Sequence, residues 1–184
     1  VYSNLWIFND RNQKKRKYIN NRLPKGDAKS NLIKGQSATI LTAIIRKSEY
    51  FNLETGFNKN YRIIGDFDLF VRISNKCLFD CVEQPLAFYR LHENNFTRKN
   101  REIEIQELED WFRDMKKIKS FFSNKELVLI NEKILYKKIT SLILKKQLLT
   151  SFLYILKFLN SIKKIKLFLA LLIPKSILEK IKEF

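Results

Sequence analysis

The sequence has few of the residues that build metal centres and disulfide frameworks. Its 184 residues include one His and two Cys, and Cys77 and Cys81 have a C-x3-C spacing. One imidazole and two thiols at that spacing do not supply the four ligands of a structural zinc site. With so few cysteines, we expect free thiols in a reducing cytosol.

Long apolar runs are also missing. The longest uninterrupted run, residues 167–173, ends at Pro174, whereas a membrane-spanning helix needs about 20 apolar residues. The sequence therefore predicts no transmembrane helix. No charged-then-apolar segment opens the chain, so we expect no signal peptide. The chain begins at Val1 and not at Met, which suggests a fragment or a truncated product.

Acidic residues are scarce relative to basic ones. The chain has 36 Lys and Arg against 19 Asp and Glu, a formal net charge of +17. From residue 111 to residue 184, 17 basic residues stand against 5 acidic ones, a net of +12 in the last part of the chain. This excess favours an anionic partner: nucleic acid, an anionic membrane surface or phosphorylated small molecules.

What is present suffices for a folded domain with a real core, because 45% of the residues are hydrophobic and 13% aromatic. Periodicity and β-branched content predict strands over residues 1–8, 37–46 and within 76–90, with a break at Pro85. Short helices are predicted over residues 30–35, 47–53 and 66–74, and a polar, basic loop over residues 9–22. Strands interleaved with short helices indicate α/β architecture.

From residue 101 onward the pattern becomes helical. Apolar residues at helical spacing predict helices over residues 101–120, 125–144 and 148–173. We therefore expect two domains, 1–100 with α/β architecture and 101–184 as an all-α, basic, amphipathic region. Lys163, Lys164 and Lys166 border apolar residues. This pattern fits a helix in the membrane interface and equally a bundle with a solvated lysine face.

Two carboxylates lie at the start of the predicted helix 66–74, in the run Gly65-Asp66-Phe67-Asp68-Leu69-Phe70-Val71-Arg72-Ile73. Asp66 follows a Gly and precedes an apolar run, so it is an N-cap candidate. By itself the run predicts a well-started helix. Phe67, Phe70, Val71 and Ile73 would then face a core, with Arg72 in solvent.

Arg90 and His92 follow in the run Pro85-Leu86-Ala87-Phe88-Tyr89-Arg90-Leu91-His92-Glu93-Asn94-Asn95. On an extended backbone, residues two apart face the same side. An Arg and a His on one face can bind a phosphate or a metal-bound diphosphate. The alternative is a solvated strand end.

Together the two runs carry a resemblance that neither carries alone. G-D-F-D-L-F-x-R-I followed by P-L-A-x-Y-R-x-H-x-x-N resembles the C-terminal part of the catalytic domain in bacterial family 2 glycosyltransferases. Val1-Tyr2-Ser3-Asn4, Leu23-Pro24-Lys25-Gly26 and Ala43-Ile44-Ile45-Arg46-Lys47-Ser48 agree in order and spacing. The resemblance covers residues 1–100. It implies the Rossmann-like GT-A fold and an inverting transfer from a nucleotide-sugar donor.

The resemblance also implies roles for single residues. Asp66 matches the general base that deprotonates the acceptor hydroxyl, and Asp68 supports the local hydrogen bonding. The family's acidic pair is usually Glu-Asp, and Gly65 replaces its first member here. Arg90 and His92 match the segment near the leaving diphosphate and its metal. Arg90 would offset developing charge, and His92 could ligate the ion.

The resemblance does not include the family's nucleotide-binding half, which ends in an Asp-x-Asp metal motif. A divalent metal, Mg²⁺ or Mn²⁺, would be held mostly by that half. Asp66-Phe67-Asp68 has the spacing of the motif but not its place. We therefore expect residues 1–184 by themselves to show little or no transferase activity. Robust sugar transfer by this chain alone would contradict that expectation.

The resemblance thus implies an enzyme of polysaccharide biosynthesis in the cell envelope. Its partners would be a nucleotide-sugar, a glycan or lipid-linked acceptor and an anionic membrane surface, with no nucleic acid. We expect a cytoplasmic protein, peripheral at the inner face of the cell membrane. Two alternatives stay open: a basic helical module that binds nucleic acid, and an inactive membrane-associated remnant. The basic tail fits the first, although its aromatic residues lie in apolar runs and form no recognised stacking motif.

Overall fold

The computed structural model describes residues 1–35, 38–53, 56–158 and 161–173. Its contacts divide the chain into two compact units, Val1–Glu126 and Leu127–Phe184, and each unit is described by itself. The first combines a small sheet with helices, which confirms the α/β class at that level. This division of contacts does not test the predicted domains, 1–100 and 101–184, which stay a prediction.

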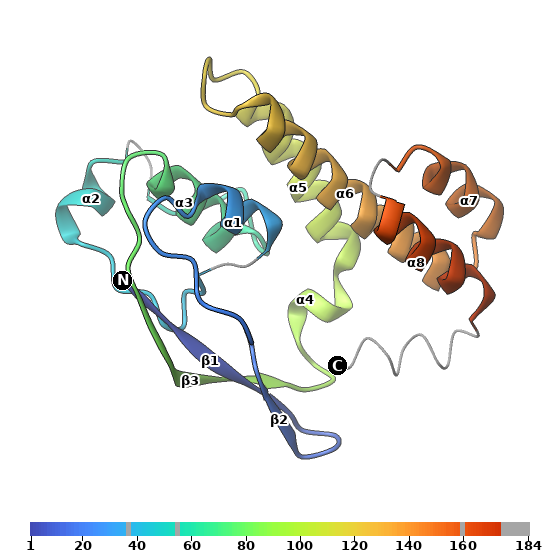
Figure 1. The fold of residues 1–184 in the computed structure, drawn as a ribbon, viewed down its shortest axis with the longest axis horizontal. Coiled ribbons are helices and arrows are strands. Elements are labelled where there is room, and N and C mark those ends of the chain that lie inside the picture. The colour runs from blue at the N-terminus through green and yellow to red at the C-terminus, as the bar shows by residue number, and fades with distance from the viewer. Residues whose placement is uncertain (36–37, 54–55, 159–160, 174–184) are drawn as a thin grey trace. The chain divides into compact units, whose positions relative to one another are not determined.

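The sheet of the first unit is three-stranded and mixed. β1 (Tyr2–Asn9) lies in the middle, antiparallel to β2 (Lys14–Lys17) and parallel to β3 (Cys81–Leu91), as Figure 1 shows. The strand predicted over residues 1–8 is confirmed. Residues 9–22 were expected to be loop throughout, and this is wrong for β2, whose four exposed basic residues pair with the end of β1.

β3 runs through Pro85 as one strand, although its pairing with β1 is irregular there. Ser3 pairs with Val82, Asn4 with Pro85 and Leu5 with Ala87, so the register shifts on both sides of Asn4. Proline lacks the N–H that a ladder needs, and it is tolerated on an edge strand or at an irregularity. β3 is such an edge strand, because it pairs only with β1 in this sheet.

The strand predicted over residues 37–46 is wrong. Residue 37 lies outside the described residues, and residues 38–46 form turns and irregular backbone. Hydrogen bonds connect them to the start of the chain: Ile44 N donates to the Val1 carbonyl, the Val1 amino group donates to the Ile44 carbonyl, and the Thr42 hydroxyl donates to the Ser3 carbonyl of β1. β-Branched apolar content favours a strand only where a partner strand offers a ladder and a face to pack against.

In the described part of the first unit, most of the helices could be predicted from local sequence patterns. The helices are α1 (Lys29–Lys34), α2 (Lys47–Phe51), α3 (Gly65–Ser74), α4 (Phe96–Lys99) and α5 (Arg101–Met115). Gly35 ends α1 in the left-handed conformation, at φ +91°, as a C-terminal glycine does. The helices predicted over residues 30–35, 47–53 and 66–74 are confirmed, whereas the one-turn helix α4 was not expected. Fully buried side chains from several of these elements fill the core, among them Leu5, Leu32, Ile33, Leu69 and Trp111.

The described part of the second unit is helical. α6 (Asn124–Leu144) begins just before the unit boundary and continues into it, and α7 (Leu148–Leu156) and α8 (Ser161–Leu172) follow. The single helix predicted over residues 148–173 is therefore two helices. The core of the unit is a cluster of four aliphatic side chains and one aromatic ring: Ile139, Ile143, Ile155, Leu167 and Phe158. No helix in the described ranges has both the length and the apolar content needed to cross a membrane.

Candidate functional site

Asp66 lies in the first turn of α3, one residue inside the helix. The helix begins at Gly65, and Ile64 occupies the N-cap position without a side-chain capping bond. The prediction that Asp66 is the N-cap is therefore wrong by two positions. Its Oδ1 accepts a hydrogen bond from the Phe67 N–H at 2.7 Å, and the residue is only partly buried. A carboxylate at this place interacts favourably with the positive end of the helix dipole.

Asp68, two positions further into the same turn, is buried, and both of its carboxylate oxygens accept hydrogen bonds. Its Oδ1 accepts a hydrogen bond from Trp111 Nε1 at 3.0 Å. Its Oδ2 accepts two from Arg72, at 3.0 Å from Nε and 2.8 Å from Nη2. The contact with Trp111 joins α3 to α5, and the Phe67 ring packs edge-on against the same indole with centroids 4.8 Å apart. Asp68 thus fixes the first turn of α3 against α5.

The expectation that Arg72 lies in solvent is wrong. Its side chain is 16% exposed, and it pairs with Asp68, whose side chain is 3% exposed. Arg72 Nη2 also donates to the Gly56 carbonyl at 2.5 Å. The i,i+4 spacing brings the two side chains together on one helix face. An Arg on a buried face needs such partners, because an unpaired charge there is costly.

A third carboxylate, Glu107 of α5, holds the backbone that leads into α3. Its Oε1 accepts the Arg62 N–H at 2.8 Å, and its Oε2 accepts the N–H groups of Ile63 at 2.9 Å and Ile64 at 3.1 Å. The sequence analysis missed this residue. The available signal was its spacing, because Glu107 lies four residues before Trp111, on the buried stripe of its helix.

The three carboxylates therefore differ in what they can do. Asp68 and Glu107 are buried and bound to fixed donors, whereas Asp66 is partly exposed at the helix start. Tyr61 senses the charge of this site: burial, and then the negative charge of Asp68, raise the pKa of its phenol. This phenol keeps its proton at neutral pH. The arrangement offers one accessible carboxylate on a rigid support.

Arg90 and His92 lie at the far end of β3, and their partners are local. Arg90 Nε donates to both carboxylate oxygens of Asp10, at 2.6 and 2.9 Å, and this contact raises the pKa of the guanidinium. His92 is exposed and follows the last strand residue, Leu91, so strand alternation does not fix the direction of its ring. Its backbone N–H donates to Asn95 Oδ1 at 2.6 Å.

Within the described ranges, no group of three or more His, Cys, Asp or Glu side chains is placed to hold a metal ion. Cys77 and Cys81 are free thiols, as expected. Cys77 Sγ donates to Glu49 at 3.1 Å, and burial raises the pKa of both thiols. Neither thiol therefore has the lowered pKa of a reactive cysteine.

Comparison with known proteins returns no relative. No protein-family model matches the chain, and no curated protein and no solved structure matches it. The glycosyltransferase resemblance therefore depends on the motifs of residues 1–100 alone.

Proposed function

We propose that this chain is the acceptor-side part of an inverting, nucleotide-sugar-dependent glycosyltransferase with a GT-A fold. The observation that carries the proposal is the difference in burial and hydrogen bonding among the three carboxylates at the start of α3. Two carboxylates are locked into the support, and Asp66 is presented from the helix end. A general base needs this combination of rigid backing and access to the acceptor.

In the proposed reaction, the acceptor hydroxyl oxygen forms a bond to the anomeric carbon of the donor sugar. The bond from that carbon to the nucleoside diphosphate breaks, and its electron pair leaves with the diphosphate. Asp66 takes the hydroxyl proton in the same step. The attack comes from the side opposite the leaving group, so the configuration at the anomeric carbon is inverted.

The support around Asp66 favours this role. Asp68 and Glu107 hold the helix start from two sides, through Trp111 and through three backbone N–H groups. Pre-organisation of this kind removes the need to reorient the base when the acceptor arrives. A Cβ added at Gly65 would meet only Phe57, at an ordinary 3.8 Å. The loss of the family's first acidic residue is therefore not forced by lack of space.

The residues that the structure describes do not by themselves fit a divalent metal site. His92 offers one imidazole, and the described part of the chain brings no cluster of three potential ligands together. We therefore derive no step through a metal ion. Arg90 fits the charge of a leaving diphosphate, because a guanidinium donates several N–H groups in one plane.

The proposal is tested by offering the full-length protein a panel of nucleotide-sugars with UDP, GDP and dTDP carriers. A membrane extract would supply glycan and lipid-linked acceptors. We expect release of nucleoside diphosphate with one donor class, and a product whose anomeric configuration, read by NMR, is inverted. A retained configuration, or no release with any donor, would overturn the proposal.

Arg90→Gln should lower kcat by about 10- to 100-fold if the guanidinium offsets charge on the leaving diphosphate. The same substitution removes an exposed ion pair with Asp10, so little stability is lost. The measurement is the steady-state rate with the donor found in the panel. Asp10→Asn is the matched control, since it breaks the same ion pair and keeps the cation. Equal loss in the two variants would mean that the ion pair, and not the cation, matters.

One observation favours a second candidate, a nucleic-acid-binding module. The pairing of the strands puts Lys17, Trp6 and Phe88 in one row, and Lys15, Phe8 and Arg90 in the next. Phe88 is 60% exposed, and Lys15 Nζ lies 5.0 Å from the centre of the Trp6 ring. Aromatic rings beside cations on a sheet can stack bases and bind phosphates. Salt-dependent binding of a single-stranded oligonucleotide, lost in Trp6→Ala, would support this candidate.

A further inference from the structure

α7 and α8 each keep an apolar stripe at the surface of the second unit. Apart from Leu148 at the first position of α7, the exposed apolar side chains of α7 and of α8 recur at intervals of three and four residues: Leu149, Phe152, Leu153 and Leu156, and then Ile162, Ile165, Leu169 and Leu172. This spacing places each set on one helix face. The two stripes are well exposed, with Leu149 at 75% and Ile165 at 60%.

The opposite faces of the same helices are already used. Ile155 of α7 and Leu167 of α8 are buried in the aliphatic core of the unit, together with Phe158. α7 and α8 pack on each other, as Figure 1 shows. Phe152 of the α7 stripe shares in this packing, because its ring meets Phe168 edge-on with centroids 5.7 Å apart while the side chain stays 43% exposed. The buried faces therefore set the orientation of the two helices, and most side chains of the apolar stripes take no part in the core.

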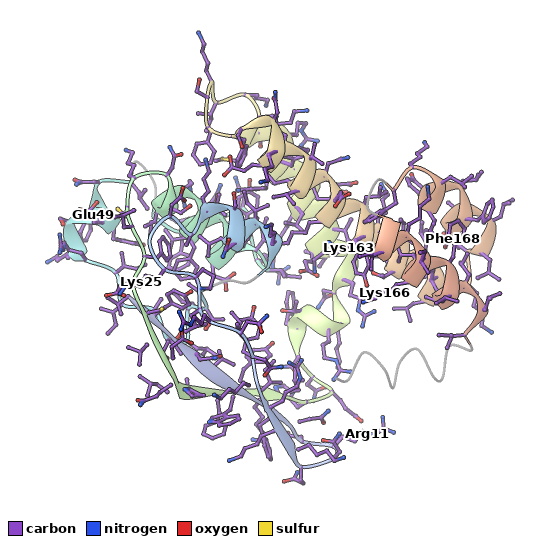
Figure 2. All side chains as sticks on the ribbon, in the orientation of Figure 1. Arg11, Lys25, Glu49, Lys163, Lys166 and Phe168 are labelled. Atoms are coloured by element: carbon purple, nitrogen blue, oxygen red, sulfur yellow. The ribbon has the colours of Figure 1, made fainter. Side chains whose placement is uncertain are left out.

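The charge around the stripes has one sign. Residues 145–173 contain six Lys and no Asp or Glu. Lys166 lies one residue after Ile165 and three before Leu169, so it borders the stripe of α8, where Figure 2 labels it with Lys163. Lys157 is exposed directly after α7. Exposed aliphatic side chains in a segment whose only charged residues are lysines match a surface that is anionic outside and apolar beneath.

We propose that the apolar stripes of α7 and α8 dock on an anionic lipid bilayer. The helices lie in the interface, with the aliphatic side chains at the acyl boundary and the lysines among the phosphate groups. A nucleic acid could neutralise the lysines, but it offers no apolar phase for Leu149 or Ile165. The lipid surface satisfies both features. This inference goes beyond the proposed reaction and does not depend on it.

The test measures partition of the full chain onto lipid vesicles by flotation. One vesicle type is phosphatidylcholine alone, and the other contains one part phosphatidylglycerol to three parts phosphatidylcholine. We expect at least about tenfold tighter partition onto the anionic vesicles, because each lysine near such a surface adds favourable interaction. Equal partition onto the two vesicle types, or none onto either, would overturn the proposal.

The apolar contribution is tested with the double variant Leu149→Asn, Ile165→Asn. Both side chains are exposed, so helix content by circular dichroism should be unchanged. Partition onto anionic vesicles should fall by at least about tenfold, since two aliphatic side chains no longer enter the acyl boundary. The matched control is Ile44→Asn, Leu78→Asn, an exposed Ile and an exposed Leu in the first unit. An equal fall in the control would refute a specific role for the stripes.

The charge contribution is tested with Lys157→Gln, Lys166→Gln against the equally charged control Lys14→Gln, Lys17→Gln in β2. We expect the first pair to weaken partition by about tenfold and the control by less than about threefold. Equal effects would show that only net charge acts, and would reject the docking surface. A second result would also reject the docking surface. In it, single-stranded oligonucleotide displaces the chain from anionic vesicles at low salt, and the double variant Leu149→Asn, Ile165→Asn binds the vesicles as tightly as the wild type.

Discussion

In the proposed transferase, Asp66→Asn is expected to lower kcat by about 10²- to 10⁴-fold, the usual contribution of a general base. Affinity for the nucleotide-sugar should stay within about twofold, because the side chain acts on the acceptor hydroxyl and not on the donor. The measurement is the rate of nucleoside diphosphate release, with donor affinity from calorimetry. Near-normal turnover would remove Asp66 from the role of base.

Stability separates this effect from unfolding. Asp66 is only partly buried, and its charge at the helix start contributes about 0.3–1 kcal/mol through the helix dipole. Asp66→Asn should therefore unfold at nearly the wild-type denaturant concentration. Asp114→Asn is the matched control, because its side chain is 53% exposed and pairs only locally with Lys117. A comparable loss of turnover in the control would mean that removing any surface carboxylate is enough.

Much of the local structure could be predicted because its causes are local. Apolar alternation specifies β1, and Gly35 ends α1 by adopting a conformation that other residues avoid. α3 follows from the periodicity of its apolar residues, with its start misplaced by one residue. The N-cap prediction failed for a different reason. Ile64 takes the N-cap position without a side-chain capping bond, and Glu107, from a helix more than forty residues away, binds the backbone N–H groups that lead into α3.

Tertiary partners explain the rest. Residues 38–46 have the composition of a buried strand, yet β3 occupies the long edge of β1 that could have paired with them. Arg72 was expected in solvent, although its i,i+4 spacing from Asp68 was a local sign of a partner. Gly56 and Asp68 enclose it. Long-range contacts of this kind leave only weak traces in one sequence, such as an acidic residue at a buried position of a helical stripe.

The motif thus contains two carboxylates in different environments. Asp68 is bound on both oxygens by fixed donors, which suits a residue that positions its neighbours. Asp66, two positions earlier in the same turn, is only partly buried. An acid that must gain and lose a proton needs access, and an acid that must hold geometry needs burial and partners. One helical turn supplies both environments.

Asp68→Asn is expected to destabilise the first unit by about 3–5 kcal/mol, the cost of removing one partner from a buried ion pair. The amide can still accept from the Trp111 indole, but Arg72 keeps a charge at a site where it is 16% exposed. The measurement is urea unfolding followed by tryptophan fluorescence, since Trp111 is itself a member of the network. The transition should move to clearly lower urea.

The double variant Asp68→Asn, Arg72→Met decides whether the charge causes the loss. Methionine fills much of the space of the Arg side chain without its charge, and replacing both members of a buried pair is often close to neutral. We therefore expect the double variant to recover about 1–3 kcal/mol of the loss in Asp68→Asn. If the double variant is less stable than Asp68→Asn, the network holds α3 through the shape and bonds of Arg72 to Gly56, and not through compensation of charge. In that case the kcat of each variant would still show whether Asp66 is held in place. Weakening the contacts of Asp68 and Arg72 shifts the position of Asp66 before it unfolds α3.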